Sequence, residues 1–224
     1  MNAASHDTDA SVAWMDSLRG RFLVFEGPDG SGKTTQFNRF VARAKDAGLA
    51  VCDVREPGGT AIGERIRAIL LDNACDEMSV RCEMLLYMAS RAQLVAERLL
   101  PAQARGELVV ADRFVHSTVA YQGAAGGISR EDIRKVADVV LAEVHPDLVL
   151  IFDVDEATAA SRITGARDRM ESKDIAFRAR VREGYLEQAR LDPERCVVVS
   201  GADEPDAVER ETLDAVRSRL AIAR

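Results

Sequence analysis

The chain has 224 residues, a length that suits one α/β domain and argues against a second full domain. With 47% hydrophobic and 30% charged residues it has the composition of an ordinary globular domain with a packed core. Its net charge of −7 argues against DNA or RNA as a partner, because proteins that follow a nucleic-acid backbone usually present a basic face.

The predicted elements follow one another in a regular alternation. Residues 1–18 lack a continuous apolar stretch and are expected to form a flexible extension, with a short docked helix around Trp14 as the alternative. Residues 19–224 are expected to form one domain. Apolar runs predict strands at 21–26, 49–55, 107–111, 147–153 and 195–200. Helical periodicity covers 34–47, 62–71, 80–104, 130–143, 158–190 and 206–223, with an end or kink expected at Pro101 and a break around Gly165. This alternation predicts a three-layer α/β fold, with a five-stranded parallel sheet flanked by helices.

Two further observations bear on the compartment. No apolar run approaches the length of a membrane span, so no membrane partner is expected. The four cysteines, Cys52, Cys75, Cys82 and Cys196, have no zinc-like or C-x-x-C spacing, which favours reduced, mostly buried thiols. We therefore expect a cytoplasmic protein.

A phosphate-binding loop follows the first predicted strand. Residues 27–34 match G-x-x-x-x-G-K-[ST] in full, between a strand and a helix. Glycines let backbone N–H groups approach phosphates, Lys33 reaches the β- and γ-phosphates, and the Thr34 hydroxyl binds Mg²⁺. The loop alone leaves a GTPase, an ATPase or a regulatory module open. The residues expected to contact ATP are Gly27, Pro28, Asp29, Gly30, Ser31, Gly32, Lys33, Thr34 and Thr35.

A carboxylate ends the third predicted strand. Asp112 follows Leu-Val-Val-Ala, and the ligand crevice of an open α/β sheet lies outside the carboxyl ends of its strands. Asp112 is therefore a second candidate ligand for Mg²⁺, beside Thr34, and Arg113 is placed to face an anion. A surface salt bridge at the end of the strand is the alternative.

Three segments behind the loop, taken together, resemble the thymidylate kinase family. They are Arg-Glu-Pro-Gly-Gly-Thr at 55–60, Leu-Leu-Tyr-Met-Ala-Ser-Arg-Ala-Gln at 85–93, and Asp-Arg-Phe-x-x-Ser-x-x-Ala-Tyr-Gln at 112–122. The resemblance extends from about Arg21 to Ser200. It implies transfer of the γ-phosphoryl group of ATP to dTMP, giving dTDP and ADP in dTTP synthesis, and it implies a homodimer.

The resemblance also implies roles for the residues that would bind dTMP. Arg67, Arg91 and Arg113 would hold the acceptor phosphate through guanidinium forks. Asp29 would accept the sugar 3′-OH, and Tyr121 would pack against the deoxyribose. Tyr87, where the family usually has Phe, would stack on thymine, although a place in the core would also suit it. Ser117 and Gln122 would read the base edge, and Glu56 and Pro57 complete the set.

Residues 162–173 resemble the family's basic lid. The loop at 27–34 contains no arginine, so the catalytic cation is expected from the lid, with Arg167 and Arg169 as candidates. Arg162 would lie against adenine. A solvated helix face with i,i+4 charge pairs is the alternative for this segment. The expected catalytic residues are therefore Lys33, Asp112, Arg167 and Arg169.

Two other functions remain open at this point. One is a kinase for another nucleotide or nucleoside, since the acceptor is inferred from resemblance. The other is a regulatory nucleotide-binding protein without turnover. A second anion site built from three arginines argues against the latter, because a switch protein needs one nucleotide.

Overall fold

The computed structural model describes residues 13–163 and 168–221. A parallel five-stranded sheet with the order β2-β3-β1-β4-β5 forms its middle layer, as predicted. The central strands β1, β3 and β4 are almost fully buried, which explains why they read as unbroken apolar runs. The strands are β1 (Phe22–Glu26), β2 (Val51–Arg55), β3 (Leu108–Asp112), β4 (Leu148–Asp153) and β5 (Cys196–Ser200).

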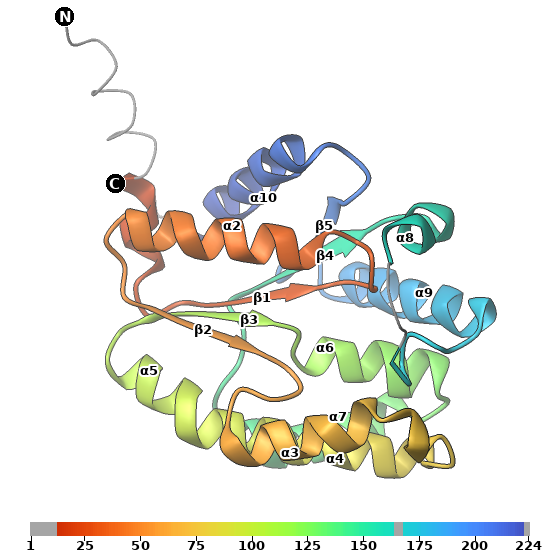
Figure 1. The fold of residues 1–224 in the computed structure, drawn as a ribbon. Helices are drawn as coiled ribbons and strands as arrows, with labels where there is room; N and C mark the ends of the chain where they lie inside the picture. The colour runs from red at the N-terminus through yellow and green to blue at the C-terminus, as the bar shows by residue number, and fades with distance from the viewer. Residues whose placement is uncertain (1–12, 164–167, 222–224) are drawn as a thin grey trace, which may run out of the picture.

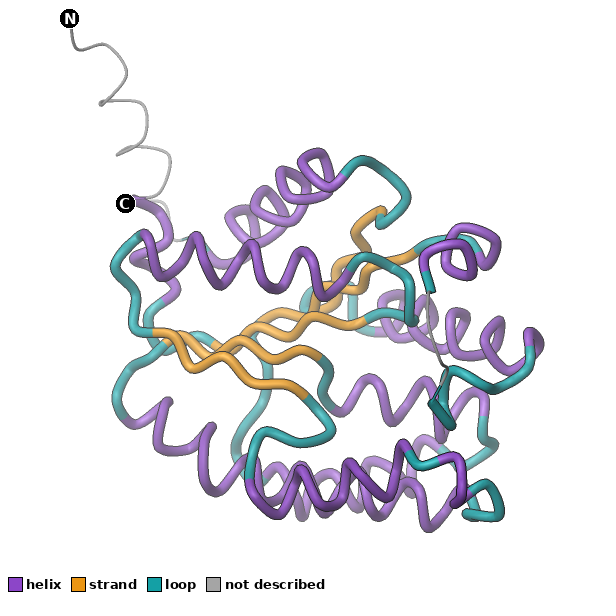
Figure 2. Tube along the Cα trace, in the orientation of Figure 1, coloured by secondary structure: helices purple, strands orange, loops and turns teal. Residues whose placement is uncertain are grey.

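Helices cover both faces of the sheet, with α2 and α10 on one face and α4, α7 and α9 on the other (Figures 1 and 2). Alternate residues of each strand serve the two cores, so Leu23 and Phe25 pack under α2 while Phe22 and Val24 face α4. The helices are α2 (Lys33–Asp46), α3 (Ala61–Leu71), α4 (Val80–Leu94), α5 (Leu100–Ala104), α6 (Val115–Thr118), α7 (Arg130–Leu141), α8 (Glu156–Arg162), α9 (Ile175–Leu191) and α10 (Pro205–Leu220).

The N-terminal segment departs from expectation at residues 13–18. These residues form a 3-10 helix, η1 (Ala13–Leu18), and Met15 and Leu18 are fully buried beside α2 and α10. For residues 13–18 the structure therefore has the short docked helix that was the alternative to a flexible extension, because the free energy gained by burying two large apolar side chains outweighs the conformational entropy lost by ordering six residues. Residues 1–12 lie outside the described residues.

Two helical stretches differ in detail from the sequence prediction. The expected helix 80–104 is continuous, but its turn at η3 (Val95–Leu99) is π-helical, and Pro101 lies in the first turn of α5. Residues 115–125, for which no helix was predicted, form α6 followed by a π-helical stretch, η4 (Val119–Ala125). Packing of η4 against α9 stabilises a segment with no amphipathic period of its own.

Candidate active site

A cavity lies at the carboxyl ends of β1, β2 and β3, where a parallel sheet places its ligand crevice. Its wall contains most of the residues expected to bind the acceptor and several that were not expected. The residues expected to bind the acceptor are Asp29, Glu56, Pro57, Arg67, Tyr87, Arg113, Ser117, Tyr121 and Gln122, and the wall also contains Lys33, Thr34 and Asp112 from the expected ATP and metal site. The others are Arg55, Leu71, Thr118, Asp168, Met170 and Glu171.

A second hollow adjoins this cavity at the phosphate-binding loop. Residues 28–35 line it together with Arg162. Gly32 adopts a left-handed conformation (φ +82°), and no side chain caps α2 behind it, so the first N–H groups of α2 remain available to an anion. Gly27 lies at the base of the loop, where a Cβ atom would come within 2.5 Å of the Phe152 carbonyl oxygen. We call this hollow the loop hollow and the larger one the acceptor cavity.

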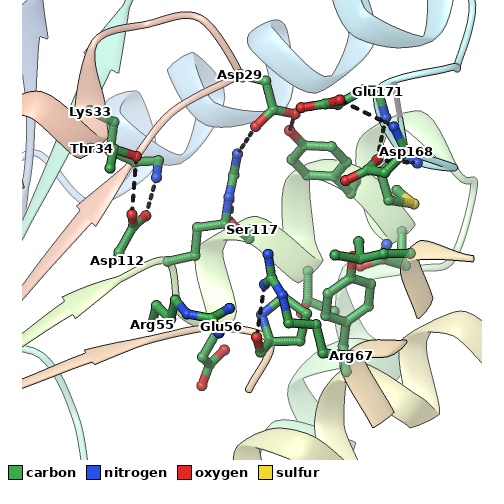
Figure 3. Close-up of a pocket in the computed structure, with 18 residues that line it drawn as sticks. Asp29, Lys33, Thr34, Arg55, Glu56, Arg67, Asp112, Ser117, Asp168 and Glu171 are labelled. Atoms are coloured by element: carbon green, nitrogen blue, oxygen red, sulfur yellow. Dashed lines mark hydrogen bonds and ion pairs between the residues drawn. The ribbon is translucent and has the colours of Figure 1, made fainter. Parts of the chain in front are cut away.

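Asp112 lines the acceptor cavity and contacts two residues that also line the loop hollow. Its carboxylate accepts hydrogen bonds from the ammonium of Lys33 and, over 3.2 Å, from the Thr34 hydroxyl (Figure 3). The pKa of Lys33 is lowered by burial and by the charge of Arg113, while Asp112 opposes both effects. A carboxylate and a hydroxyl converging from two elements suit Mg²⁺, which takes one or two protein ligands and completes its shell with water and phosphate.

Arg113 holds the centre of the acceptor cavity in an unusual backbone conformation. Its φ is +72°, which costs a side chain with a Cβ atom free energy, and its N–H donates to the Phe25 carbonyl oxygen over 2.9 Å. The guanidinium pairs with Asp29 at 2.5 Å and donates to Gly27 O and Tyr185 Oη, each over 3.0 Å. The strained turn thus directs a buried cation toward the end of the loop.

Asp29 is correspondingly held as an anion. Burial acts to raise the pKa of this carboxyl group, but Arg113 and Lys33 together lower it below its ordinary value. The Tyr121 hydroxyl also donates to Asp29, over 3.3 Å. Asp29, Asp168 and Glu171 form an acidic side of the cavity, opposite Arg55, Glu56 and Arg67 (Figure 3).

A buried carboxylate behind the cavity was not anticipated from the sequence. Glu26, at the end of β1, is fully buried and accepts hydrogen bonds from Phe114 N, Ser117 N, Ser117 Oγ and Tyr185 Oη over 2.7 to 3.1 Å. It therefore fixes the start of α6 and the Ser117 hydroxyl. The available signal was a charged residue ending an apolar strand directly before the loop.

The chain matches the family model described as thymidylate kinase over residues 25–212. The chain belongs to the thymidylate kinase family. It is 44% identical to a thymidylate kinase of Deinococcus radiodurans over 203 residues, covering 90% of this chain and 98% of that protein. It is 41% identical to one of Caldanaerobacter subterraneus over 204 residues, covering 91% and 98%. A crystal structure of the Ehrlichia chaffeensis thymidylate kinase superposes with a TM-score of 0.72 at 30% identity, covering 88% of this chain and 98% of that one.

Within this thymidylate kinase fold, Arg91 does not reach the cavity wall. Its side chain is 1% exposed and binds Glu56 at 2.6 Å, the Thr118 hydroxyl at 3.1 Å and the Phe114 carbonyl oxygen at 3.0 Å. The anion that this buried cation needs is thus a protein carboxylate. Burial raises the pKa of Glu56 to about 7, although the charge of Arg91 opposes the shift. Arg91 therefore lies behind the cavity wall in this structure, where it pairs with Glu56, and its role as a phosphate ligand stays a prediction.

The structure describes two of the lid arginines, Arg162 and Arg169. Arg169 is buried and pairs with Glu83 of α4 at 2.5 Å in this structure, and its role as a catalytic cation stays a prediction. Arg167 lies outside the described residues. Arg162 borders the loop hollow, where it donates to Gly201 O over 2.6 Å.

The residues expected from the resemblance to contact the base differ in whether their polar atoms already have hydrogen-bond partners in the protein. Ser117 Oγ is engaged by Glu26. Gln122 donates its amide N–H to Glu83 over 2.7 Å. Burial raises the pKa of Tyr87, whose hydroxyl has no hydrogen-bond partner among the described residues.

In the described part of the chain, no helix combines the length and apolar character needed to cross a membrane.

Proposed function

We propose that this chain transfers the γ-phosphoryl group of ATP to dTMP, giving ADP and dTDP, as a step in dTTP synthesis. One observation carries the proposal: the loop hollow and the acceptor cavity share Asp29, Lys33 and Thr34. A donor on the loop and an acceptor beside Arg113 would therefore meet end to end. Two adjoining anion sites suit a kinase and exceed what a nucleotide switch requires.

The chemistry needs positioning more than a strong base, because an acceptor phosphate oxygen is already ionised. Lys33 and the first N–H groups of α2 would bind the donor phosphates, and Arg55, Arg67 and Arg113 would attract the acceptor phosphate. Mg²⁺, when bound at Thr34 and Asp112, would neutralise charge on the transferred group. Donor phosphates would draw Lys33 away from Asp112, which frees the carboxylate for the metal. Arg167 remains our candidate for the lid cation.

The proposal is tested by ADP production with ATP, Mg²⁺ and each nucleoside monophosphate in turn. We expect strong turnover with dTMP, weaker turnover with dUMP and negligible turnover with AMP, CMP and GMP. Turnover with a different monophosphate would overturn the assigned acceptor and leave the kinase. ATP binding without turnover on any acceptor would point to the regulatory alternative.

We further propose a cytoplasmic homodimer formed through α3, α4 and α7. These three helices pack side by side, and each exposes large apolar side chains that a second copy would cover. The exposed residues are Ile62 and Ile69 on α3, Leu85 on α4 and Val139 on α7.

A further inference from the structure

The orientation of the Gln122 side chain is fixed from behind the acceptor cavity. Gln122 is 1% exposed, and its Nε2 lies 2.7 Å from a carboxylate oxygen of Glu83. A carboxylate accepts hydrogen bonds and donates none, so only the NH₂ end of the amide can face it. Gln122 Oε1 therefore points away from Glu83, and it has no donor among the described residues. Since Gln122 lines the cavity, its amide offers a ligand one acceptor and one remaining N–H.

Glu83 is itself held in place by Arg169, a residue of the lid segment 162–173. Arg169 pairs with the other carboxylate oxygen at 2.5 Å, and both side chains are about 95% buried. Arg169 is anchored in turn, because its Nε donates to Leu70 O over 2.8 Å and its backbone N–H to Leu71 O over 3.3 Å. Glu83 lies in the first turn of α4, where the helix dipole favours a negative charge. Turning the amide over would place Oε1 against this charged carboxylate.

We propose that Glu83, held by Arg169, locks Gln122 in the orientation that pairs with an imide edge and so makes the chain reject cytosine nucleotides. Thymine and uracil present an N–H donor beside a carbonyl acceptor, which matches the locked amide. Cytosine presents a ring-nitrogen acceptor beside an amino donor, which requires the opposite orientation. The inference deepens the proposed function and rests on it. Glu83 and Arg169 are positioning residues, since neither lines the cavity.

The test is the substitution Glu83→Gln, with kcat/KM measured for dTMP, dUMP and dCMP. A glutamine at position 83 accepts or donates, so Gln122 can adopt either orientation. We expect the preference for dTMP over dCMP to fall about tenfold or more. With Gln122 free to turn over, the cytosine edge can be paired and no longer leaves buried polar groups without partners. The preference for dTMP over dUMP should stay unchanged, because both bases present the same edge.

Two further variants make the outcome decisive. Glu83→Gln leaves the charge of Arg169 without its partner. The double variant Glu83→Gln, Arg169→Gln carries no buried charge at this position, and its kcat/KM values and melting temperature are therefore measured as well. Glu77→Gln, an exposed carboxylate before the same helix, is the control and should change no preference. A parallel loss with all three acceptors in a folded variant would overturn the lock and leave the kinase standing. A wild-type protein that does not prefer dTMP would instead refute the proposed function.

Discussion

At the scale of single residues, Arg113 shows how the site is preorganised. Its left-handed backbone and its contacts with Asp29, Gly27 and Tyr185 place a guanidinium between the loop hollow and the acceptor cavity. Several donors in a fixed plane are needed to satisfy these partners together, and an ammonium group cannot reproduce them. The site therefore requires both the positive charge of Arg113 and the planar arrangement of its guanidinium donors.

Arg113→Lys should accordingly raise KM for dTMP and lower kcat/KM by about 100-fold, since two charged hydrogen bonds of about 1.5 kcal/mol each are lost. Steady-state kinetics at saturating ATP measure this effect. Arg43→Lys replaces an arginine whose exposed side chain pairs with Glu209, and it should leave the kinetics unchanged. An Arg113→Lys enzyme with wild-type KM would show that this cation does not hold the acceptor.

Asp29 predicts a pH dependence of stability. Its folded pKa is lower than its ordinary value of 3.8, so its ion pair contributes stability above that value and loses it as pH falls through the folded pKa. The unfolding free energy of the wild type should exceed that of Asp29→Asn by no more than about 1 kcal/mol at pH 6, because the carboxylate is partly exposed. Urea titrations at pH 6 and pH 3 should show this difference shrinking in acid. A difference that grows in acid would contradict the ion pair.

At the scale of elements, the loop and α8 are fitted to each other through a glycine. A Cβ atom on Gly30 would come within 2.4 Å of the Ala159 carbonyl oxygen of α8, and the residue has a φ of +80°. Backbone atoms cannot yield as a side chain does. Gly30→Ala must therefore displace α8, which carries Arg162 at the edge of the loop hollow.

We expect Gly30→Ala to raise KM for ATP and to lower the melting temperature. Gly48→Ala is the matched control, because Gly48 has a φ of +82° but nothing within 4 Å of an added Cβ. It should lose about 1–2 kcal/mol of stability from the backbone alone and keep its KM for ATP. Equal KM values in the two variants would mean that the contact with α8 does not shape the ATP site.

The elements also show what local sequence can and cannot predict. The strands and the loop follow from apolar runs and from glycine spacing, which are properties of neighbouring residues. Residues 115–125 carry no apolar period that predicts a helix. Their helical stretch is stabilised instead by contacts with Glu26 and α9, which are far away in the sequence. Arg91 was predicted as a phosphate ligand and Arg169 as a lid cation, and the sequence does not reveal that Glu56 and Glu83 pair with them, because these partners are distant along the chain.

At the scale of the whole molecule, the face formed by α3, α4 and α7 is the surface that a second copy is proposed to cover. Val139 on α7 is 84% exposed, and Leu85 on α4 is 53% exposed. A large apolar side chain that is exposed to this extent gains free energy when a partner covers it, and contiguous exposed apolar area marks interaction sites. α3 and α4 also carry Arg67 and Tyr87, so a partner pressed on them would support the acceptor cavity from behind.

Val139→Asp should therefore convert a dimer into a monomer, because the interface would have to bury an unpaired carboxylate. Sedimentation velocity at micromolar protein concentration measures the change directly. Leu191→Asp, at the end of α9 and away from these helices, replaces a side chain that is 60% exposed and should leave the mass of the assembly unchanged. If the wild type itself sediments as a monomer, the second copy is ruled out as the partner of this face. If Val139→Asp remains a dimer, the interface lies elsewhere on the molecule.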